Sequence, residues 1–283
     1  MHHYVMTLTC PDRPGIVHAV AGALLDAGGN IVENAQFGDE LTQTFCMRTR
    51  FETELASVDD VRASLAPVAE RFRGELAVRS EAVVPRVLIM VSRMDHCLHD
   101  LLYRWGTGDL PIEIPLVVSN HPDCGELVAR HGIPYVHLPV TAATKHDQEA
   151  RLVELIEQHA IDFVVLARYM QVLSAELCAG FPGRIINIHH SFLPGFKGAK
   201  PYHQAHDRGV KLIGATAHYV TDDLDEGPII EQDVVRVTHA QSAAEFAVIG
   251  RDVERMVLAR AVRYQAESRV LLIGRRTVVF ASY

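Results

Sequence analysis

The chain has 283 residues, 48% of them hydrophobic and 22% charged, and its formal net charge is −8. This length allows one large domain or two modest ones. The acidic balance excludes a general nucleic-acid binder, which needs an excess of cations to neutralise phosphates. The five cysteines are widely spaced and form no Cys-x-x-Cys pair, so the sequence favours neither a zinc ribbon nor a disulfide framework.

The sequence also lacks the features that direct a chain to a membrane. No apolar run approaches the roughly 18 residues that span a bilayer. The first residues lack a charged segment followed by an apolar one, which is the pattern of a signal peptide. Together with the unpaired cysteines, this predicts a cytoplasmic protein that binds no membrane.

Residues 1–80 alternate between strand and helix patterns. Asp12 is expected to cap the first helix, and Gly28-Gly29 to end it with one glycine in the left-handed conformation. Ser57 with Asp60 forms a capping box for the second helix. The expected strands are residues 4–9, 30–37, 42–51 and 75–78, and the expected helices are 16–24 and 58–72. This βαββαβ order in about 80 residues is typical of a ferredoxin-like plait.

Residues 79–85 are expected to form a linker, and the pattern of strands and helices differs after it. Short β-branched runs alternate with helical patterns, which predicts a mostly parallel sheet with helices on both faces. The expected strands are 86–91, 115–120, 135–138, 162–167 and 185–189, and the expected helices are one that ends at Trp105, then 123–131 and 148–159. The final elements expected are strands 214–220 and 229–237 joined by an acidic loop, a helix from Ser242 to about Tyr264 and a hairpin in 269–280.

One strand of this sheet ends in polar, proton-handling residues. Ile185-Ile186-Asn187-Ile188-His189 leads into a loop, and in parallel α/β sheets ligands bind outside the carboxyl ends of the strands. Asn187 and His189 are two residues apart, so their side chains share one face of the strand. An amide can stabilise an oxyanion and an imidazole can move a proton, which suits carbonyl chemistry. The residues alone leave a second interpretation open, in which Asn187 caps a turn and His189 is a hydrogen-bonded core residue.

The loop of residues 220–228 adds a candidate carboxylate to this site. It contains four acidic residues, among them Asp225, and it follows a strand that carries His218. Clustered acids in a loop are usually exposed to solvent. Their place in a domain that already has Asn187 and His189 favours a role in catalysis.

The turns of residues 1–80 resemble those of ACT domains. The resemblance rests on Asp12-Arg13-Pro14-Gly15-Ile16-Val17 followed by Gly28-Gly29-Asn30-Ile31. It implies a unit that joins subunits into a homo-oligomer and binds an amino acid, with glycine and methionine as candidate effectors. The residues that it marks for the effector are Asp12, Arg13, Gly15, Ile16 and Asn30. A unit that only holds an oligomer together stays an alternative.

The rest of the chain resembles the folate-dependent formyltransferase family. The motifs are Asn187-x-His189 with Ser191-x-Leu193-Pro194, then His218-Tyr219-Val220-Thr221 and Asp225-x-Gly227-Pro228. The resemblance implies that Asn187, His189 and Asp225 are catalytic and that residues 166–173 line the pterin pocket. The substrate-binding residues that it implies are Leu166, Met170, Gln171, Leu173, His190, His218, Val220, Thr221 and Asp222. It implies no metal, and no cofactor beyond the folate substrate, 10-formyltetrahydrofolate.

Within this family the sequence is similar to the deformylase branch. Glycinamide ribonucleotide enzymes carry a Gly- and Asn-rich loop after the first strand to cradle a phosphate, and residues 91–96 of this chain lack glycine. An ACT domain in residues 1–80 before a catalytic domain in residues 85–283 resembles the enzymes that hydrolyse 10-formyltetrahydrofolate to formate and tetrahydrofolate. Ser92-Arg93 and His96-Cys97-Leu98 add to this resemblance. Such a reaction supplies formate for purine synthesis and balances the one-carbon folate pools.

Three other functions stay open at the level of the sequence. One is formyl transfer to an amine acceptor, and another is a sensor that binds amino acid and folate without catalysis. The third is a metal hydrolase that uses His189, His190, His218 and Asp225. It is disfavoured because adjacent histidines point apart on a strand and the sequence has no His-Glu-x-x-His motif. The sequence does not identify the residues that admit water and exclude an amine.

Overall fold

The computed structural model describes residues 1–195 and 201–281. The chain forms two compact units. The N-terminal unit is Met1–Val84 together with Glu267–Tyr283, and the large unit is Pro85–Ala266. These units differ from the expected domains at the C-terminus, because the segment after Ala266 joins the N-terminal unit and not the large one.

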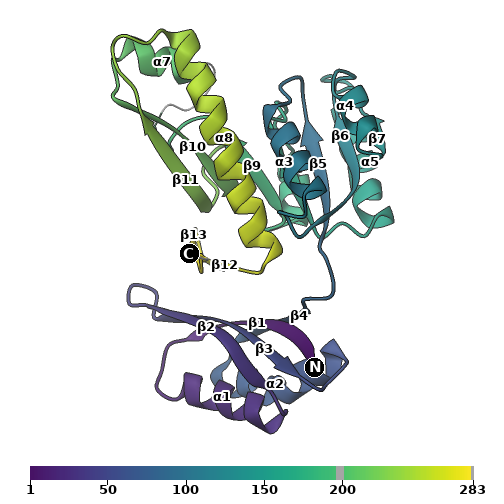
Figure 1. Ribbon diagram of the computed structural model, residues 1–283, viewed down its shortest axis with the longest axis vertical. Coiled ribbons are helices and arrows are strands. Elements are labelled where there is room, and N and C mark those ends of the chain that lie inside the picture. The colour runs from purple at the N-terminus through teal and green to yellow at the C-terminus, as the bar shows by residue number, and fades with distance from the viewer. Residues whose placement is uncertain (196–200, 282–283) are drawn as a thin grey trace. The chain divides into compact units, whose positions relative to one another are not determined.

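The N-terminal unit is a four-stranded antiparallel sheet with two helices on one face (Figure 1). Its elements are β1 (His2–Pro11), α1 (Ile16–Asp26), β2 (Asn30–Asp39), β3 (Thr44–Thr53), α2 (Val58–Phe72) and β4 (Glu75–Ser80). The strand order β2-β3-β1-β4 confirms the predicted plait. Alternate residues of β1, such as Met6 and Leu8, pack with Leu24 of α1 and Leu65 of α2 in the core.

Helix capping in this unit follows the predictions in part. The Ser57 side chain caps α2 by accepting hydrogen bonds from N–H groups of its first turn, and Gly28 after α1 has the predicted left-handed backbone. The expected cap of α1 by Asp12 is wrong. Gly15 is the N-cap of α1 at φ 96°, without a hydrogen bond from any side chain, because glycine reaches this conformation more readily than residues with a Cβ.

The C-terminal hairpin belongs to the same unit. It consists of β12 (Val270–Ile273) and β13 (Arg276–Val279). Leu271 and Ile273 are buried against Cys46 of β3, which points away from the face covered by the helices. Arg48 of β3 donates to the carbonyl oxygen of Glu267 over 3.1 Å. These contacts explain why the last segment of the chain joins the first unit.

The large unit is built on a seven-stranded sheet with the order β11-β10-β9-β8-β5-β6-β7. Its strands are β5 (Arg86–Val91), β6 (Glu113–Ser119), β7 (Tyr135–His137), β8 (Phe163–Leu166), β9 (Ile185–His189), β10 (Leu212–Tyr219) and β11 (Ile229–Arg236). The strands from β9 to β7 are parallel, and β10 and β11 add to them antiparallel. This confirms the predicted sheet, in which β5, β8 and β9 end at the same edge.

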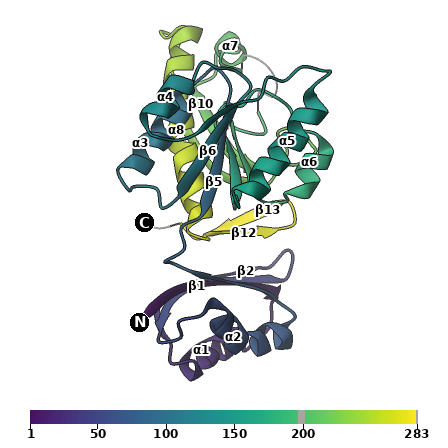
Figure 2. The same cartoon turned by 90° about the vertical axis from the view of Figure 1, so that its right-hand side faces the viewer.

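Helices cover both faces of this sheet, as predicted (Figure 2). They are α3 (His96–Gly106), α4 (Gly125–Arg130), α5 (Lys145–Gln158), α6 (Ala175–Gly180), α7 (Pro201–Asp207) and α8 (Ala243–Ala266). Leu152 of α5 and Leu177 of α6 pack with strand residues in one core cluster. On the opposite face α8 runs along β9 and β10. The sequence does not predict α6 and α7, which have six and seven residues.

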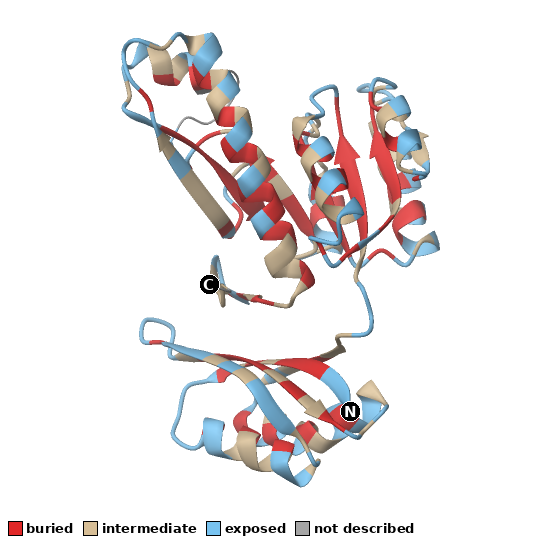
Figure 3. Cartoon of the chain, in the orientation of Figure 1, coloured by how far each residue is buried: buried red, intermediate tan, exposed pale blue. Residues whose placement is uncertain are grey.

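The sheets of the two units differ in how far their strands are buried. Figure 3 shows β5 and β6 of the large unit buried, whereas β2 of the N-terminal unit is largely exposed. Every residue of β5 after Arg86 is buried, as expected of a parallel strand with helices on both sides. Among the described helices, none is long and apolar enough to cross a membrane.

Candidate active site

Asn187 and His218 face each other across two antiparallel strands. They are paired residues of β9 and β10, and Asn187 Nδ2 lies 3.3 Å from His218 Nε2. His218 Nδ1 donates to the Tyr219 carbonyl oxygen over 2.9 Å. Burial lowers the pKa of His218, so the ring is neutral and its Nε2 accepts a hydrogen bond from the amide of Asn187. This bond determines how the Asn187 amide is oriented.

His189 pairs with Asp225. His189 Nδ1 lies 3.2 Å from Asp225 Oδ1, and the same oxygen lies 3.8 Å from His218 Nε2. Burial opposes the charged form of Asp225, but the hydrogen bond and the charge of His189 outweigh it and lower the pKa of this carboxyl. Asp225 is therefore ionised at neutral pH.

The loop after β10 brings Asp225 to this position. Val220 is still hydrogen-bonded to Ile185, at the start of β9, whereas Asp225 reaches His189 at its end. Asp225 has φ 58°, a left-handed conformation that aspartate adopts more readily than most residues. A Cβ at position 227 would overlap the Tyr219 carbonyl oxygen, so the return of the loop requires glycine.

One nitrogen of His189 lacks a partner. Among the described residues, no group hydrogen-bonds to His189 Nε2, although the side chain is only 5% exposed. Buried core histidines normally have their polar atoms satisfied. This argues against the interpretation of His189 as a core residue. The residue lines a cavity, where a reactant can supply the missing partner.

The cavity has a volume of about 520 Å³, within the range of roughly 300–1,000 Å³ that is common for small-molecule sites. The predicted residues that line it are Leu166, Met170, Gln171, Leu173, Asn187, His189, His190, His218, Val220, Thr221, Asp222 and Asp225. The structure thus brings every predicted catalytic and substrate-binding residue to one place. Their proximity is what a shared role in one reaction requires.

The cavity wall also contains a buried ion pair that the sequence does not predict. Arg168 Nε lies 3.4 Å from Glu254 Oε2, and the two side chains are 7% and 1% exposed. Glu254 also accepts a hydrogen bond from the Tyr202 hydroxyl over 2.6 Å and lies 2.8 Å from His96 Nε2. Burial opposes the charge of Glu254, but these partners outweigh it and lower the pKa of the carboxyl. We call His96, Arg168, Tyr202 and Glu254 the Glu254 network.

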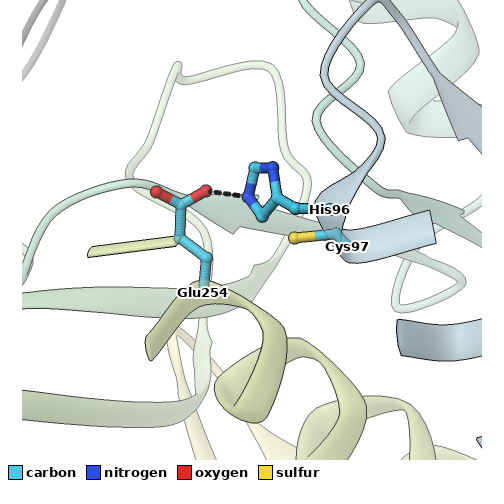
Figure 4. A group of neighbouring side chains, drawn as sticks. All are labelled: His96, Cys97 and Glu254. Carbon is cyan, nitrogen blue, oxygen red and sulfur yellow. Dashed lines mark hydrogen bonds and ion pairs between the residues drawn. The ribbon is translucent and has the colours of Figure 1, made fainter. Parts of the chain in front are cut away.

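His96, Cys97 and Glu254 lie close enough together to hold a metal ion (Figure 4), with ligand atoms within 4.8 Å of one another. Charge argues against this use, because Arg168 already neutralises Glu254. Burial also raises the pKa of the Cys97 thiol well above its ordinary value, whereas a metal binds the thiolate. The set expected of a metal hydrolase, His189, His190, His218 and Asp225, forms no such group within residues 1–195 and 201–281.

The predicted effector residues lie in different surroundings. Asp12, Arg13 and Gly15 occupy the loop between β1 and α1, and the guanidinium of Arg13 lies 4.7 Å from the ring centre of Phe72. Ile16 is buried in the core of the unit. Its side chain therefore packs against hydrophobic residues.

Asn30 is separated from that loop. It lies opposite Glu52 at one end of β3. Pro11, which precedes the loop, pairs with Thr44 at the other end of β3. Within one chain, strand register therefore places Asn30 a strand's length from the other predicted effector residues.

Residues 4–66 match the ACT domain family, and residues 85–262 match the formyl transferase family. Fold and site together therefore define a formyl transferase-type domain joined to an ACT domain. The predicted fold class is confirmed in both parts.

Similarity to characterised proteins extends over nearly the whole chain. It is 50% identical to the formyltetrahydrofolate deformylase of Corynebacterium sp. (strain P-1), over 98% of this chain and 97% of that protein. It is 42% identical to the deformylase of Escherichia coli (strain K12), over 97% of each. The chain belongs to the formyltetrahydrofolate deformylase family, which confirms the resemblance seen in the sequence.

Solved structures separate this family from its transferase relatives. The crystal structure of formyltetrahydrofolate deformylase from Burkholderia mallei is 54% identical, with a TM-score of 0.95 over 99% of this chain and 100% of that one. Glycinamide ribonucleotide transformylase 1 from Symbiobacterium toebii is 30% identical, with a TM-score of 0.66 over 70% of this chain and 95% of that one. The two kinds of enzyme share the fold of the large unit.

Proposed function

We propose that this chain hydrolyses 10-formyltetrahydrofolate to formate and tetrahydrofolate. The observation that carries the proposal is the His189–Asp225 pair, in which the buried Nε2 of His189 lacks a partner beside a cavity of suitable size. Similarity to deformylases over nearly the full chain supports the substrate. The reaction needs no metal or cofactor beyond the folate itself.

Catalysis begins with attack of water on the formyl carbon, which turns the formyl oxygen into an oxyanion. Protonated His189, held through Nδ1 by Asp225, donates a hydrogen bond from Nε2 to this oxygen. The Asn187 amide, oriented by its bond to His218, donates a second one. Donors directed at charge that develops in the transition state stabilise it more than they stabilise the substrate.

Asp225 handles the proton of the attacking water. Its lowered pKa keeps the carboxylate ionised and able to accept a hydrogen bond from water. As the tetrahedral intermediate collapses, the bond between the formyl carbon and N10 breaks. One proton of the attacking water ends on N10, the formic acid that is released ionises to formate, and tetrahydrofolate leaves.

The folate is bound by the remaining predicted residues. Leu166, Leu173 and Val220 offer apolar contact to the pterin ring, and Gln171 and Thr221 offer hydrogen bonds. Their common position on the cavity lining supports this assignment. Met170, Asp222, His190 and His218 complete the proposed substrate-binding set.

The test is release of formate from 10-formyltetrahydrofolate without any amine, with wild type compared to Asp225→Asn. Asparagine keeps the size of the side chain and tolerates φ 58°, so the variant removes the charge and retains the loop. Release that falls by about 10²–10³ in the variant supports the proposal. Release from the wild type only after an amine is added would make the protein a transferase, and folate binding without turnover would make it a sensor.

We also propose that the N-terminal unit binds an amino-acid effector and assembles the chain into a homo-oligomer. The match to the ACT domain family supports both points. The loop of Asp12, Arg13 and Gly15 precedes the N-terminus of α1, whose N–H groups have no side-chain cap and attract a carboxylate. A rise in melting temperature with glycine or methionine supports an effector site, and no shift with either argues that the unit only assembles subunits.

The proposed reaction has a place in one-carbon metabolism. Formate is the one-carbon unit that purine synthesis requires, and its release converts formylated folate into free folate. All five cysteines are free thiols and are buried, which supports a reducing cytoplasmic location.

A further inference from the structure

The Glu254 network lies in the cavity of the proposed reaction but takes no part in its chemistry. It joins residues far apart in the chain, because His96 starts α3, Tyr202 lies in α7 and Glu254 lies in α8. Arg168, Tyr202 and Glu254 line the same cavity as His189. Burial of an ion pair carries a desolvation penalty, so a buried pair beside a reacting group calls for a functional explanation.

Both oxygens of Glu254 already have partners. Its Oε1 accepts a hydrogen bond from the Tyr202 hydroxyl over 2.6 Å. Its Oε2 lies 2.8 Å from His96 Nε2 and 3.4 Å from Arg168 Nε. A carboxylate with partners on both oxygens holds the side chains around it in place.

Arg168 occupies the cavity wall in an unusual conformation. Its backbone has φ 64°, a left-handed conformation that is strained for arginine. The Ser92 amide donates to its carbonyl oxygen over 3.2 Å, and its Nη2 lies 3.8 Å from Met94 Sδ. These contacts place the Arg168 backbone beside the end of β5 and its guanidinium beside Met94.

Tyr202 brings the network close to His189. A Cβ at position 250 of α8 would overlap the Tyr202 ring, so Gly250 makes room for the ring beside the helix. The ring centre of His190 lies 6.2 Å from that of Tyr202 and 5.1 Å from that of His189. One side chain therefore separates the network from the proposed reaction centre.

We propose that the Glu254 network fills the part of the cavity that an amine acceptor needs, and so limits the nucleophile to water. The inference rests on the proposed hydrolysis and assigns the selection of water to Arg168 and Tyr202, held in place by Glu254. Water needs no room beyond the formyl carbon, whereas an amine brings a substituent that must lie beside His189.

Removal of this bulk should convert part of the hydrolysis into formyl transfer. In the transfer reaction the amine nitrogen bonds to the formyl carbon, and the bond from that carbon to N10 breaks. One proton passes from the amine to N10. The products are an N-formyl amine and tetrahydrofolate, so N-formyl product and formate report the two routes separately.

The experiment compares two variants that both lack the buried charges. Arg168→Gly with Glu254→Gln opens the cavity, and glycine relieves the strain at φ 64°. Arg168→Met with Glu254→Gln is the matched control, because methionine keeps most of the bulk. Each variant and the wild type receive 10-formyltetrahydrofolate with glycinamide as the probe amine, and formate and N-formylglycinamide are measured together.

We expect the open variant to form N-formylglycinamide about tenfold faster than the wild type or the control, as pocket shape commonly discriminates by such factors. Equal rates in a folded open variant and in the control would overturn the inference, while formate release by the wild type would leave the hydrolysis proposal intact. A wild type that releases no formate without amine would instead overturn the hydrolysis proposal itself.

A second pair of variants decides the matter if the open variant does not fold. Tyr202→Ala opens the same wall, and Tyr202→Phe keeps the ring while it removes the hydrogen bond to Glu254. The inference predicts more N-formylglycinamide from Tyr202→Ala than from Tyr202→Phe. Equal amounts from the two would overturn it, because loss of the network's hydrogen bond is common to both.

Discussion

Asp225 and Glu254 both line the cavity, and their surroundings differ. Asp225 lies in a loop and pairs with His189, and its side chain is 10% exposed. Glu254 lies within the long helix α8, is 1% exposed, and has partners on both oxygens. Both have lowered pKa values because their partners outweigh the effect of burial. The same chemical group is thus open to a reactant in one place and saturated in the other.

The supporting elements explain this difference. The loop that carries Asp225 presents the carboxylate beside the unpartnered nitrogen of His189. The helix that carries Glu254 holds it among side chains from other segments of the large unit. A carboxylate that acts on a reactant must be able to accept a hydrogen bond from it. A carboxylate that shapes a cavity is instead held in place by hydrogen bonds and ion pairs with neighbouring side chains.

The largest expected effect comes from a new carboxylate at the reaction centre. Asn187→Asp places a negative charge beside the developing oxyanion and removes a donor, so formate release should fall by more than about 10³. In Asn187→Ala, which only removes the donor, formate release should fall by about 10²–10³. Steady-state formate release measures both. An Asp variant as active as the Ala variant would show that the oxyanion does not form near residue 187.

The next prediction is that loss of the Glu254 charge destabilises the fold more than loss of the Asp225 charge. Glu254→Gln leaves Arg168 buried without a counter-charge and should lower the free energy of unfolding by about 3 kcal/mol. Asp225→Asn, in a loop, should lower it by less than about 1 kcal/mol. Urea unfolding of the large unit measures both changes. A greater loss in Asp225→Asn would contradict the assignment of the structural role to Glu254.

A smaller effect is expected from the residue that accommodates the network. Gly250→Ala adds a methyl group against the Tyr202 ring, so it should lower the free energy of unfolding by about 1–3 kcal/mol despite the better helix propensity of alanine. Thermal unfolding measures the change. The double variant Gly250→Ala with Tyr202→Ala should recover part of the loss, and no recovery would mean that the ring is not what the methyl group meets.

The most gradual effect is a dependence of stability on pH. Burial, with the charges of Arg168 and His189, lowers the pKa of His190 to about 3. The folded protein then holds His190 neutral, while the unfolded chain protonates it below about pH 6.5. Stability should therefore fall by about 1 kcal/mol per pH unit as the pH decreases from 6 to 4.

His190→Gln isolates this contribution. Unfolding curves of the variant should depend less on pH than those of the wild type between pH 6 and pH 4. The lowered pKa values of Asp225 and Glu254 act in a different range, because their stabilisation is present above about pH 4 and is lost below it. Identical pH profiles for variant and wild type would mean that His190 titrates in the same way in both states.

Strand periodicity and motif spacing predict most of the fold and the polar centre of the site. Asn187 and His189 share a strand face because side chains alternate along a strand, and the structure adds His218 opposite Asn187. Register between strands is the part that a single sequence does not reveal. Asn30 was assigned to the same effector site as Asp12, and strand pairing places the two at opposite ends of β3 within one chain.

The Glu254 network shows a second limit of sequence-based prediction. A glutamate inside a helix usually faces solvent, and only the tertiary structure reveals that His96, Tyr202 and Arg168 converge on Glu254. Arg168 lies within the segment 166–173 that was predicted to line the pocket. The left-handed backbone of Arg168 could not be predicted, because non-glycine residues rarely adopt this conformation and the residue type does not indicate it.

The C-terminal hairpin makes the N-terminal unit discontinuous in the chain, which has a consequence for the order of folding. Residues 1–84 precede the large unit in the chain, and the segment that buries Cys46 follows it. The N-terminal sheet therefore has Cys46 uncovered until residues 85–266 have been synthesised and the hairpin segment follows them. The N-terminal unit depends for its final packing on residues that lie on the other side of the large unit in the sequence.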